Sequence, residues 1–347
     1  MANGGILSHQ AALEMTKKIF EARGLPPEEA YQVASALVWA NLRGIDSHGI
    51  IRIPGYMMRL EKGIVNPRPK MRIVKETLAA MVIDADHGHG QVAITFGMKK
   101  AIEKAKKASI GWVLVRKTKH SGAVGYYTRM AANAGMAGLY MGASSPNMAY
   151  HGTKAGGVST SPISMSVPRD GGKTISLDMA TAIAGVGKLM EHKALNEPLG
   201  EGWALDDDGN PTTDPQVANL PRPLGGPKGS GLSLMFECMS SLMVGSAILE
   251  PWLSGVNQKH HQNAVVAAID ISAFVDLSVY CNQSEGLAKA IKGLPKAEGV
   301  DEVLIPGERS DAVYEKRLRD GFFVPATIWS ATVEIAEKYN VPVPKLA

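Results

Sequence analysis

The chain has 347 residues, of which 20% are charged and 37 are glycine, and its 37 Lys and Arg against 33 Asp and Glu give a formal net charge of +4. This balance is too mild for a protein that binds nucleic acid or a membrane surface through clustered charge, and no run of about 18 apolar residues could span a bilayer. The two cysteines, Cys238 and Cys281, form no disulfide framework and favour a cytoplasmic location.

The first 68 residues have helical patterns. A helix over 8–23 begins at a capping serine, and this stretch lacks the basic-then-apolar order of a signal peptide. Two prolines open a second helix that runs to Leu42. A third helical piece starts at His48, with Pro54 as an interruption. The segment 66–69, Asn-Pro-Arg-Pro, is a natural boundary.

Beyond this boundary the pattern mixes strands with helices. Residues 193–230, rich in Gly, Pro and Asp, predict a long loop, and residues 308–339 predict a helical tail that packs back on the N-terminal helices. Alternation and apolar runs predict strands near 71–76, 78–86, 111–117, 136–144, 163–167, 174–178 and 264–271, and helices over 91–108, 123–134 and 232–247 and from the 180s onward.

A first glycine motif, Gly88-His-Gly-Gln-Val-Ala93, matches the G-x-G-x-x-A turn that holds a dinucleotide. It follows a predicted strand and opens a helix, where backbone N–H groups can meet a pyrophosphate. The next strand should end in an acidic residue for the ribose, but basic residues follow it instead. These basic residues are Arg116, Lys117 and Lys119. They would favour the 2′-phosphate of NADP only if they line the site of the adenosine. A plain strand-to-helix turn is the alternative.

A second glycine segment, 225–231, reads Gly-Gly-Pro-Lys-Gly-Ser-Gly and stands directly before a helix. Successive backbone amides and Lys228 at a helix start can bind an anion, although the spacing differs from that of a nucleotide-binding P-loop. An ordinary loop is the alternative.

Two histidines, His48 and His120, have neighbours or positions that are typical of residues that transfer a proton. His48 and Arg52 are four residues apart and share a face if the segment is helical, with Ser47 placed to orient the ring. An imidazole that exchanges a proton near neutral pH, beside a guanidinium that grips a carboxylate, suits a 2-oxo or 2-hydroxy acid. His120 ends a predicted strand, where α/β enzymes keep functional groups. A salt-bridging surface face and a buried helix cap are the respective alternatives.

The remaining histidines raise the alternative of a metal site. His87 and His89 form an H-x-H pair, which His120 or His151 could complete beside two aspartates, Asp84 and Asp86. A glycine turn lacks the rigid ligand spacing of a helical H-E-x-x-H motif, so we expect no metal.

Taken in this order, the segments resemble the malate/L-lactate dehydrogenase family that is distinct from the Rossmann-type enzymes of those names and includes ureidoglycolate and sulfolactate dehydrogenases and diketogulonate reductase. The most specific motifs are Ser-His-Gly-x-x-Arg at 47–52, Leu-Asp-Met-Ala-Thr at 177–181 and Gly-Gly-Pro-Lys-Gly-x-Gly-Leu at 225–232. The matching segments cover nearly the whole chain: 43–69, 84–93, 119–138, 144–152, 176–188, 202–215, 223–235 and 305–309.

The resemblance implies an α/β fold in which a mixed, mostly antiparallel sheet with flanking helices binds NAD or NADP in a non-Rossmann manner. It also implies a small helical domain built from both termini, so we expect residues 1–68 to join 309–347 and residues 69–308 to form the NAD(P)-binding domain. A homodimer with sites near its interface is implied as well. The turn at Gly88 then becomes structural, or at most a wall of the site.

The resemblance also implies roles for individual residues. His48 or His120 would carry the proton, with Ser47 beside the former, and the sequence does not choose between the two histidines. Arg52 would hold the substrate carboxylate, and Ser144 would contact substrate or cofactor. The cofactor contacts implied are His120, Ser121, Gly122, Ser144, Asp178, Met179, Ala180, Lys228, Gly229, Pro306, Gly307 and Glu308.

Three departures from the family pattern concern the substrate side. Residues 159–162 read Ser-Thr-Ser-Pro in place of Gly-Thr-Asn-Pro, and residues 119–122 read Lys-His-Ser-Gly in place of Asn-His-Phe-Gly. Lys188 stands where imine-reducing members carry an acidic residue, which favours a carbonyl substrate.

We therefore expect an NAD(P)-dependent oxidoreductase that interconverts a small 2-hydroxy acid, such as malate, lactate or ureidoglycolate, and its 2-oxo acid. The alternatives are a reductase of a cyclic or N-methyl imino acid, a metal-dependent hydrolase and a non-catalytic anion-binding protein.

Overall fold

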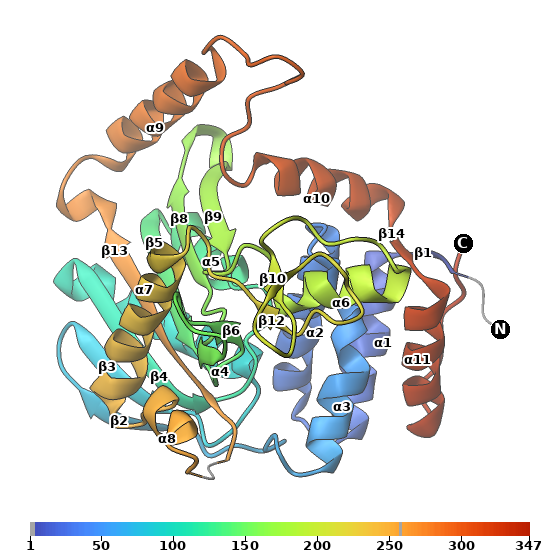
Figure 1. The fold of residues 1–347 in the computed structure, drawn as a ribbon. Coiled ribbons are helices and arrows are strands. Elements are labelled where there is room, and N and C mark those ends of the chain that lie inside the picture. The colour runs from blue at the N-terminus through green and yellow to red at the C-terminus, as the bar shows by residue number, and fades with distance from the viewer. Residues whose placement is uncertain (1–3, 257–258) are drawn as a thin grey trace.

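The computed structural model describes residues 4–256 and 259–347, and residues 1–3 of the expected helical domain lie outside this description (Figure 1). The helices are α1 His9–Ala22, α2 Pro27–Leu42, α3 Ile53–Glu61, α4 Gly90–Ala108, α5 Gly125–Asn133, α6 Val186–Leu195, α7 Pro227–Phe236, α8 Leu249–Leu253, α9 Leu277–Lys292, α10 Glu308–Asp320 and α11 Ala326–Lys338. The strands are β1 Gly5–Leu7, β2 Arg72–Glu76, β3 Ala80–Asp84, β4 Ile110–Thr118, β5 Met136–Ala143, β6 Met148–Ala149, β7 Gly156–Val158, β8 Ile163–Pro168, β9 Thr174–Met179, β10 Ala204–Leu205, β11 Pro211–Thr212, β12 Leu220–Pro221, β13 Gln262–Asp270 and β14 Phe322–Val324.

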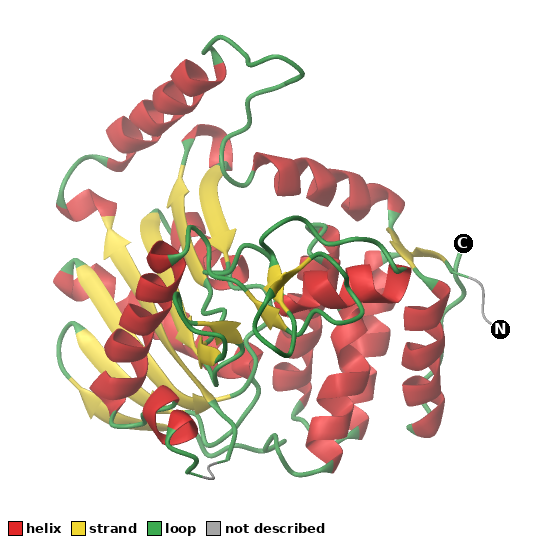
Figure 2. Ribbon diagram, viewed as in Figure 1, coloured by secondary structure: helices red, strands yellow, loops and turns green. Residues whose placement is uncertain are grey.

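A seven-stranded sheet in the order β2-β3-β4-β13-β5-β8-β9 forms the centre of the larger part of the molecule (Figure 2). Only β3 and β4 are parallel, joined through α4, and every other neighbouring pair is antiparallel. The expected mixed, mostly antiparallel α/β fold is therefore confirmed. A Rossmann sheet is excluded, because its strands run parallel.

Helices cover both faces of this sheet. On one face α4 and α5 pack against β4, β13, β5 and β8 around a buried cluster that includes Ile83, Ile94, Val113 and Tyr127. The other face contacts the end of α7 and the turns that follow it, through Leu114, Phe236 and Val265. The central strands β4, β13 and β5 are therefore buried from both sides, which explains their nearly continuous apolar runs.

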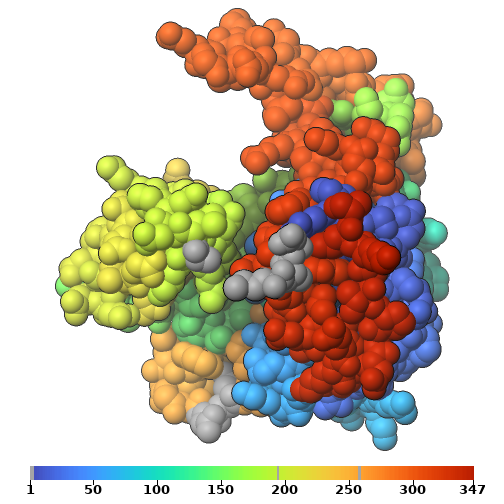
Figure 3. All heavy atoms as spheres, turned by 90° about the vertical axis from the view of Figure 1, so that its right-hand side faces the viewer, coloured from blue at the N-terminus to red at the C-terminus, as the bar shows by residue number. Residues whose placement is uncertain are grey.

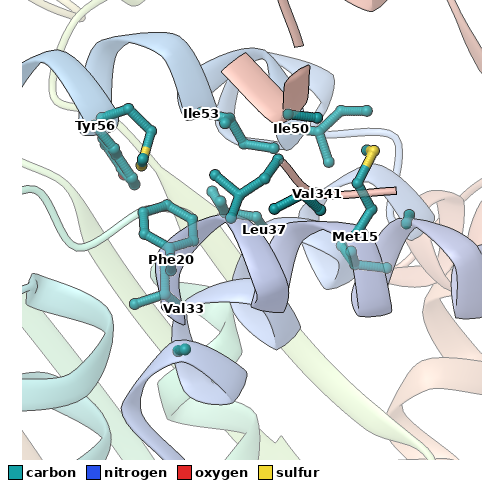
Figure 4. Packing of buried hydrophobic residues seen from close by; sticks show 14 of the residues in the cluster. Met15, Phe20, Val33, Leu37, Ile50, Ile53, Tyr56 and Val341 are labelled. Carbon is teal, nitrogen blue, oxygen red and sulfur yellow. The ribbon is translucent and has the colours of Figure 1, made fainter. Parts of the chain in front are cut away.

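The terminal segments form a second, helical layer, as predicted. Ser8 caps α1 by accepting a hydrogen bond from the backbone N–H of Ala11 at 3.3 Å, and β1 pairs with β14 of the tail. Phe20, Leu37, Ile50, Ile53 and Tyr56 pack in a common core (Figure 4). Phe322, Val324 and Trp329 of the tail belong to the same cluster, and the last residues cover the N-terminal helices in Figure 3. The division of the chain at residues 68 and 309 stays a prediction.

Three local expectations were wrong. The third helical piece is interrupted at Gly49 rather than at Pro54, because proline fits the first turn of α3 without disturbing it. The long loop over 193–230 contains the small sheet β11-β10-β12, and α7 starts within it at Pro227. Helix α9, which projects from the body in Figure 1, was missed although Asp276 caps it by accepting from the backbone N–H of Ser278. None of the described helices is long and apolar enough to cross a membrane.

Candidate active site

A cavity of about 560 Å³ lies where the helical layer meets one edge of the large sheet. Strands β4, β5 and β9 end at this edge, and β8 and β13 begin there, because these neighbours run antiparallel. Segments far apart in the sequence therefore converge: 45–52 and 185–190 on one side, and 120–124, 142–147, 159–162, 178–180 and 260–262 on the other.

Ser47, His48 and Arg52 line the cavity from two short helical turns, Asp46–His48 and Ile50–Arg52, rather than from one continuous helix. Gly49 between them is extended (φ −87°, ψ −150°), and a Cβ there would overlap the side chain of Asn41. The guanidinium of Arg52 donates from Nε to the carbonyl oxygen of Ser47 at 2.5 Å. The three side chains predicted to act together therefore do lie together.

Two residues outside the cavity hold this turn in place. The carboxylate of Asp46 accepts hydrogen bonds from Asn41 of α2 at 2.7 Å and from Arg317 of α10 at 2.8 Å. Asn41 in turn accepts from the backbone N–H of Ile50 at 2.8 Å. The C-terminal helix α10 therefore helps to fix the turn that carries His48, a contact that no local sequence pattern indicates.

His120 lines the cavity beside His48, and the two imidazoles stack with centroids 5.4 Å apart and an interplanar angle of 25°. Nδ1 of His120 lies 2.6 Å from the phenolic oxygen of Tyr56, which also accepts from Gln91 Nε2 at 3.0 Å. Ser47 Oγ lies 3.0 Å from Nδ1 of His48. Each ring is thus oriented through Nδ1 by a hydroxyl group.

Burial keeps both imidazoles neutral near pH 7. It lowers the pKa of His48 to about 4, with Arg52 adding a smaller effect in the same direction. Burial, and then the neighbouring His48 and Arg52, hold the pKa of His120 well below its usual value. A neutral imidazole can accept a proton from a hydroxyl group, which is the role of a general base.

The glycine turn at 88–90 is a strand-to-helix turn between β3 and α4, and it packs against the backbone of His120. A Cβ at Gly90 would overlap the backbone carbonyl groups of Lys119 and His120, so only glycine lets the start of α4 approach this segment. Gln91, the next residue of the motif, reaches Tyr56 from here. The motif does not line the cavity.

The opposite wall is rich in hydroxyl groups and carries Asp178 near the end of β9. Asp178 accepts from the backbone N–H of Gly125 at 2.7 Å, and its side chain faces the cavity while the chain encloses it elsewhere. This enclosure raises its pKa to about 6, against the smaller effects of Gly125 and Arg129. Ser144 lies nearby and accepts from Gln262 at 3.3 Å. Ser121, Gly122, Met179 and Ala180 also line the cavity, as expected of cofactor contacts.

Five of the expected cofactor contacts do not line the cavity. Lys228 is exposed on the first turn of α7, and Gly229 packs against the carbonyl oxygen of Thr181, just beyond the 178–180 segment. Pro306 accepts from the backbone N–H of Ser176 at 2.9 Å on the outer edge of β9. The carboxylate of Glu308 pairs with Arg169 and Lys292, and Gly307 packs beside Arg129.

The basic residues that follow β4 do not line the cavity either. Arg116 pairs with Asp84 at 3.0 Å and Lys117 lies 3.5 Å from the same carboxylate. Lys119 is buried and donates to the carbonyl oxygen of His260. Because these basic residues do not line the cavity, they give no indication there of a site for the 2′-phosphate of NADP.

The structure bears on two alternative functions, a metal-dependent hydrolase and an imine reductase. Within residues 4–256 and 259–347, no three His, Cys, Asp or Glu side chains lie close enough to hold a metal ion, so the hydrolase alternative has no ligand set there. His89 is buried against Phe20, with ring centroids 5.4 Å apart. Lys188 lines the cavity and pairs with Glu191 at 3.1 Å, so the imine-reductase alternative stays open.

The sequence interpretation missed four residues at or beside the cavity: Tyr56, Arg59, Gln91 and His260. Arg52, Tyr56 and Arg59 are spaced i, i+4 and i+7, which places them on one helical face, and this signal was available in the sequence. No local pattern points to Gln91 or His260, because their partners are distant in the chain.

Comparisons with known proteins agree with this architecture. Residues 7–332 match the family model described as malate/L-lactate dehydrogenase. The chain is 36% identical to the L-sulfolactate dehydrogenase of Methanocaldococcus jannaschii, over 97% of this chain and 98% of that one. It is 29% identical to the ureidoglycolate dehydrogenase (NAD(+)) of Escherichia coli strain K12, over 90% of each chain.

A solved structure agrees equally well. The malate dehydrogenase of Entamoeba histolytica superposes with a TM-score of 0.93 at 29% identity, over 99% of this chain and 100% of that one. Family model, relatives and fold all cover nearly the full length of the chain. The resemblance read from the sequence is thus confirmed: the chain belongs to the malate/L-lactate dehydrogenase family and is an oxidoreductase.

Proposed function

We propose that the protein is a nicotinamide-dependent dehydrogenase that interconverts a small 2-hydroxy acid and its 2-oxo acid. The observation that carries this proposal is the convergence of Arg52 with two stacked, neutral imidazoles, His48 and His120, in one cavity. A guanidinium can bind the substrate carboxylate through two parallel hydrogen bonds, which leaves the C2 hydroxyl group within reach of a histidine.

We infer that His120 exchanges the proton with the substrate oxygen. The phenolic oxygen of Tyr56 has two lone pairs, so it can accept both from Gln91 and from an N–H at Nδ1 of His120. With the hydrogen on Nδ1, the lone pair of Nε2, which has no partner among the described residues, is available to take the proton of the substrate hydroxyl group. His48, stacked on His120 and held by Ser47, would exclude water and keep the neighbouring ring in place.

The hydroxyl-rich wall fits a nicotinamide cofactor. Asp178 has one oxygen occupied by the N–H of Gly125, so its other oxygen is available to a ribose hydroxyl group. Ser121, Gly122, Ser144, Met179 and Ala180 line the same stretch. When bound, the nicotinamide ring supplies the hydride acceptor or donor for substrate C2. The NAD(+) in the name of the ureidoglycolate dehydrogenase relative supports NAD rather than NADP.

The five expected contacts outside the cavity remain part of the proposal. Gly229 adjoins the residue after 178–180, so Lys228 would reach a phosphate group that extends beyond the cavity. Pro306, Gly307 and Glu308 would border the same cofactor from the outer edge of β9.

We also propose that the chain forms a homodimer. The helical segments 227–244 and 249–253 expose Met235, Met243, Trp252 and Leu253, each between 46% and 59% exposed. Large apolar side chains that stay exposed on consecutive helical segments are typical of a subunit interface. Sedimentation at micromolar concentration tests the proposal, and a monomer there would end it.

The experiment that tests the function is a panel of 2-oxo acids and one cyclic imino acid, each with NADH and with NADPH, scored by the loss of nicotinamide absorbance. We expect turnover with 2-oxo acids and NADH. Turnover restricted to the imino acid would replace the proposed substrate class. Chelator-sensitive hydrolysis without any change in nicotinamide absorbance would overturn the redox assignment altogether.

A further inference from the structure

The cavity contains more positive charge than one carboxylate requires. Three of its lining residues are permanent cations, Arg52, Arg59 and Lys188, whereas Asp178 is the single carboxylate among the described residues that line it. Lys188 already pairs with Glu191. If Arg52 holds the carboxylate next to C2, Arg59 is left without an anion.

Arg59 is placed to act on the same ligand as Arg52. Arg52 immediately precedes the first residue of α3, and Arg59 lies seven residues further along, about two helical turns away on the same side, with Tyr56 between them. The rise along the helix axis is about 10 Å, a separation that two long arginine side chains can close around a short molecule. Within the described parts of the chain, the guanidinium of Arg59 has no hydrogen bond and no ion pair.

The groups around Arg59 make this end of the cavity electropositive. His260 lines the cavity here, and its carbonyl oxygen accepts from the buried Lys119. Burial, then Lys119 and Arg59, lower the pKa of His260 to about 4. Burial, then Lys259 and Arg59, lower the pKa of Lys119 to about 8.

Within the described residues, no carboxylate pairs with Arg59 or Lys119. The acid nearest to Arg59 in the sequence, Glu61, pairs with Lys338 at 2.7 Å. A half-buried guanidinium with other positive charge beside it is stabilised when an anion joins it. The geometry therefore favours a ligand with negative charge at this end.

We propose that Arg59, with His260 beside it, binds a second anionic group of the substrate. This inference rests on the proposed function and names its substrate class: 2-oxo acids with a carboxylate or sulfonate at the far end of a short chain. Those that end in a methyl group leave the cationic end without a partner and are poorer substrates.

The test compares substrates that differ in this one group. Oxaloacetate and 3-sulfopyruvate carry a second anion, and 2-oxobutanoate has the carbon skeleton of oxaloacetate with a methyl group at the end. We expect wild-type kcat/KM to be about 10- to 100-fold higher for a dianion than for 2-oxobutanoate, since the second anion adds a hydrogen-bonded charge pair. The better of the two dianions identifies carboxylate or sulfonate.

In Arg59→Met we expect kcat/KM for the dianions to fall about 10- to 100-fold and that for 2-oxobutanoate to change less than threefold. The matched control is Arg72→Met, which removes an exposed arginine of β2 outside the cavity and should alter neither value. An equal loss for all three acids in Arg59→Met, or a wild-type preference for 2-oxobutanoate, overturns the inference.

A binding measurement separates this inference from the proposed function. If no 2-oxo acid oxidises NADH, the proposed function fails, while the rise of the wild-type Tm with oxaloacetate still tests the anion site. We expect that rise to exceed the rise with 2-oxobutanoate and to be lost in Arg59→Met. Equal rises for both acids would contradict the second anion site.

Discussion

The phenolic oxygen of Tyr56 lies 2.6 Å from Nδ1 of His120, although 64 residues separate them in the chain. Gln91 donates to the same oxygen from the start of α4, so three elements meet at one hydroxyl group. The orientation of the proposed proton carrier thus depends on a tyrosine of the helical layer and on a glutamine of the glycine motif.

Tyr56→Phe should lower kcat about 10- to 100-fold with a smaller effect on KM. The phenyl ring keeps the packing of the core but leaves Nδ1 of the buried His120 without its partner, a loss of about 1–3 kcal/mol. Steady-state rates followed by nicotinamide absorbance measure it. Tyr339→Phe, which removes a hydroxyl group that contacts Glu61 outside the cavity, serves as the control. A fully active Tyr56→Phe would refute the orienting role.

Gln91→Met should reduce kcat and shift the pH profile of kcat while leaving stability nearly unchanged. Gln91 is buried and its Oε1 has no partner in the described part of the chain, so an apolar side chain of similar shape removes this atom together with the bond to Tyr56. We expect the free energy of unfolding to change by less than about 1 kcal/mol. Denaturant titration and rate profiles are measured on the same variant. A stability loss with an unchanged pH profile would indicate packing alone.

Arg52→Lys should lower kcat/KM about 10- to 200-fold. A lysine keeps the positive charge but cannot form two parallel hydrogen bonds to a carboxylate, and each charge-assisted bond contributes about 1.5–3 kcal/mol. Lysine also loses the bond from Arg52 Nε to the carbonyl oxygen of Ser47. An unchanged kcat/KM in this variant would remove Arg52 from the substrate site.

Acid should destabilise the protein partly through His89. Burial lowers the pKa of this imidazole to about 3, whereas an unfolded histidine titrates near 6.5. The unfolded state therefore binds the proton first, so this contribution is complete above about pH 6.5 and decreases as the pH falls toward 3.

In His89→Leu the loss of unfolding free energy between pH 6.5 and pH 4 should be smaller than in the wild type by about 3 kcal/mol. Denaturant unfolding at several pH values measures this slope. The exposed His151, replaced by Gln, should keep the wild-type slope. Parallel slopes in wild type and His89→Leu would contradict the prediction.

Gly90→Ala and Gly55→Ala should have opposite effects. A Cβ at Gly90 overlaps the backbone of Lys119 and His120, so we expect a loss of about 1–3 kcal/mol in stability and a lower kcat. Nothing lies within 4 Å of a Cβ at Gly55 in α3, where alanine should stabilise by about 0.5–1 kcal/mol. Thermal unfolding of both variants tests the pair, and a neutral Gly90→Ala would show that the 119–120 segment can move.

Local signals in the sequence located most elements and the central residues of the site. Capping by Ser8, prolines at the start of α2 and the alternation of apolar residues depend on neighbours within a few positions, so they can be read directly. Ser47, His48 and Arg52 are likewise close in the chain. Helix α9 was missed because its polar residues and internal glycine weaken the apolar pattern, and the 193–230 loop because its strands have only two residues each.

The sequence by itself determined the family, the helical termini and the strand-and-helix pattern, and it supplied the chemistry proposed for the Ser-His-Gly-x-x-Arg motif, because these depend on residue type and short spacing. Only the tertiary structure decided that His48 stacks on His120, that Tyr56 and Gln91 contact the latter or each other, and that Arg59 and His260 line the same cavity, where Arg59 pairs with no acid among the described residues. It also placed Lys228 and Glu308 outside the cavity. The physical reason is that antiparallel pairing brings the last residues of β4, β5 and β9 and the first residues of β13 to one edge of the sheet. This pairing depends on contacts between residues that are far apart in the chain.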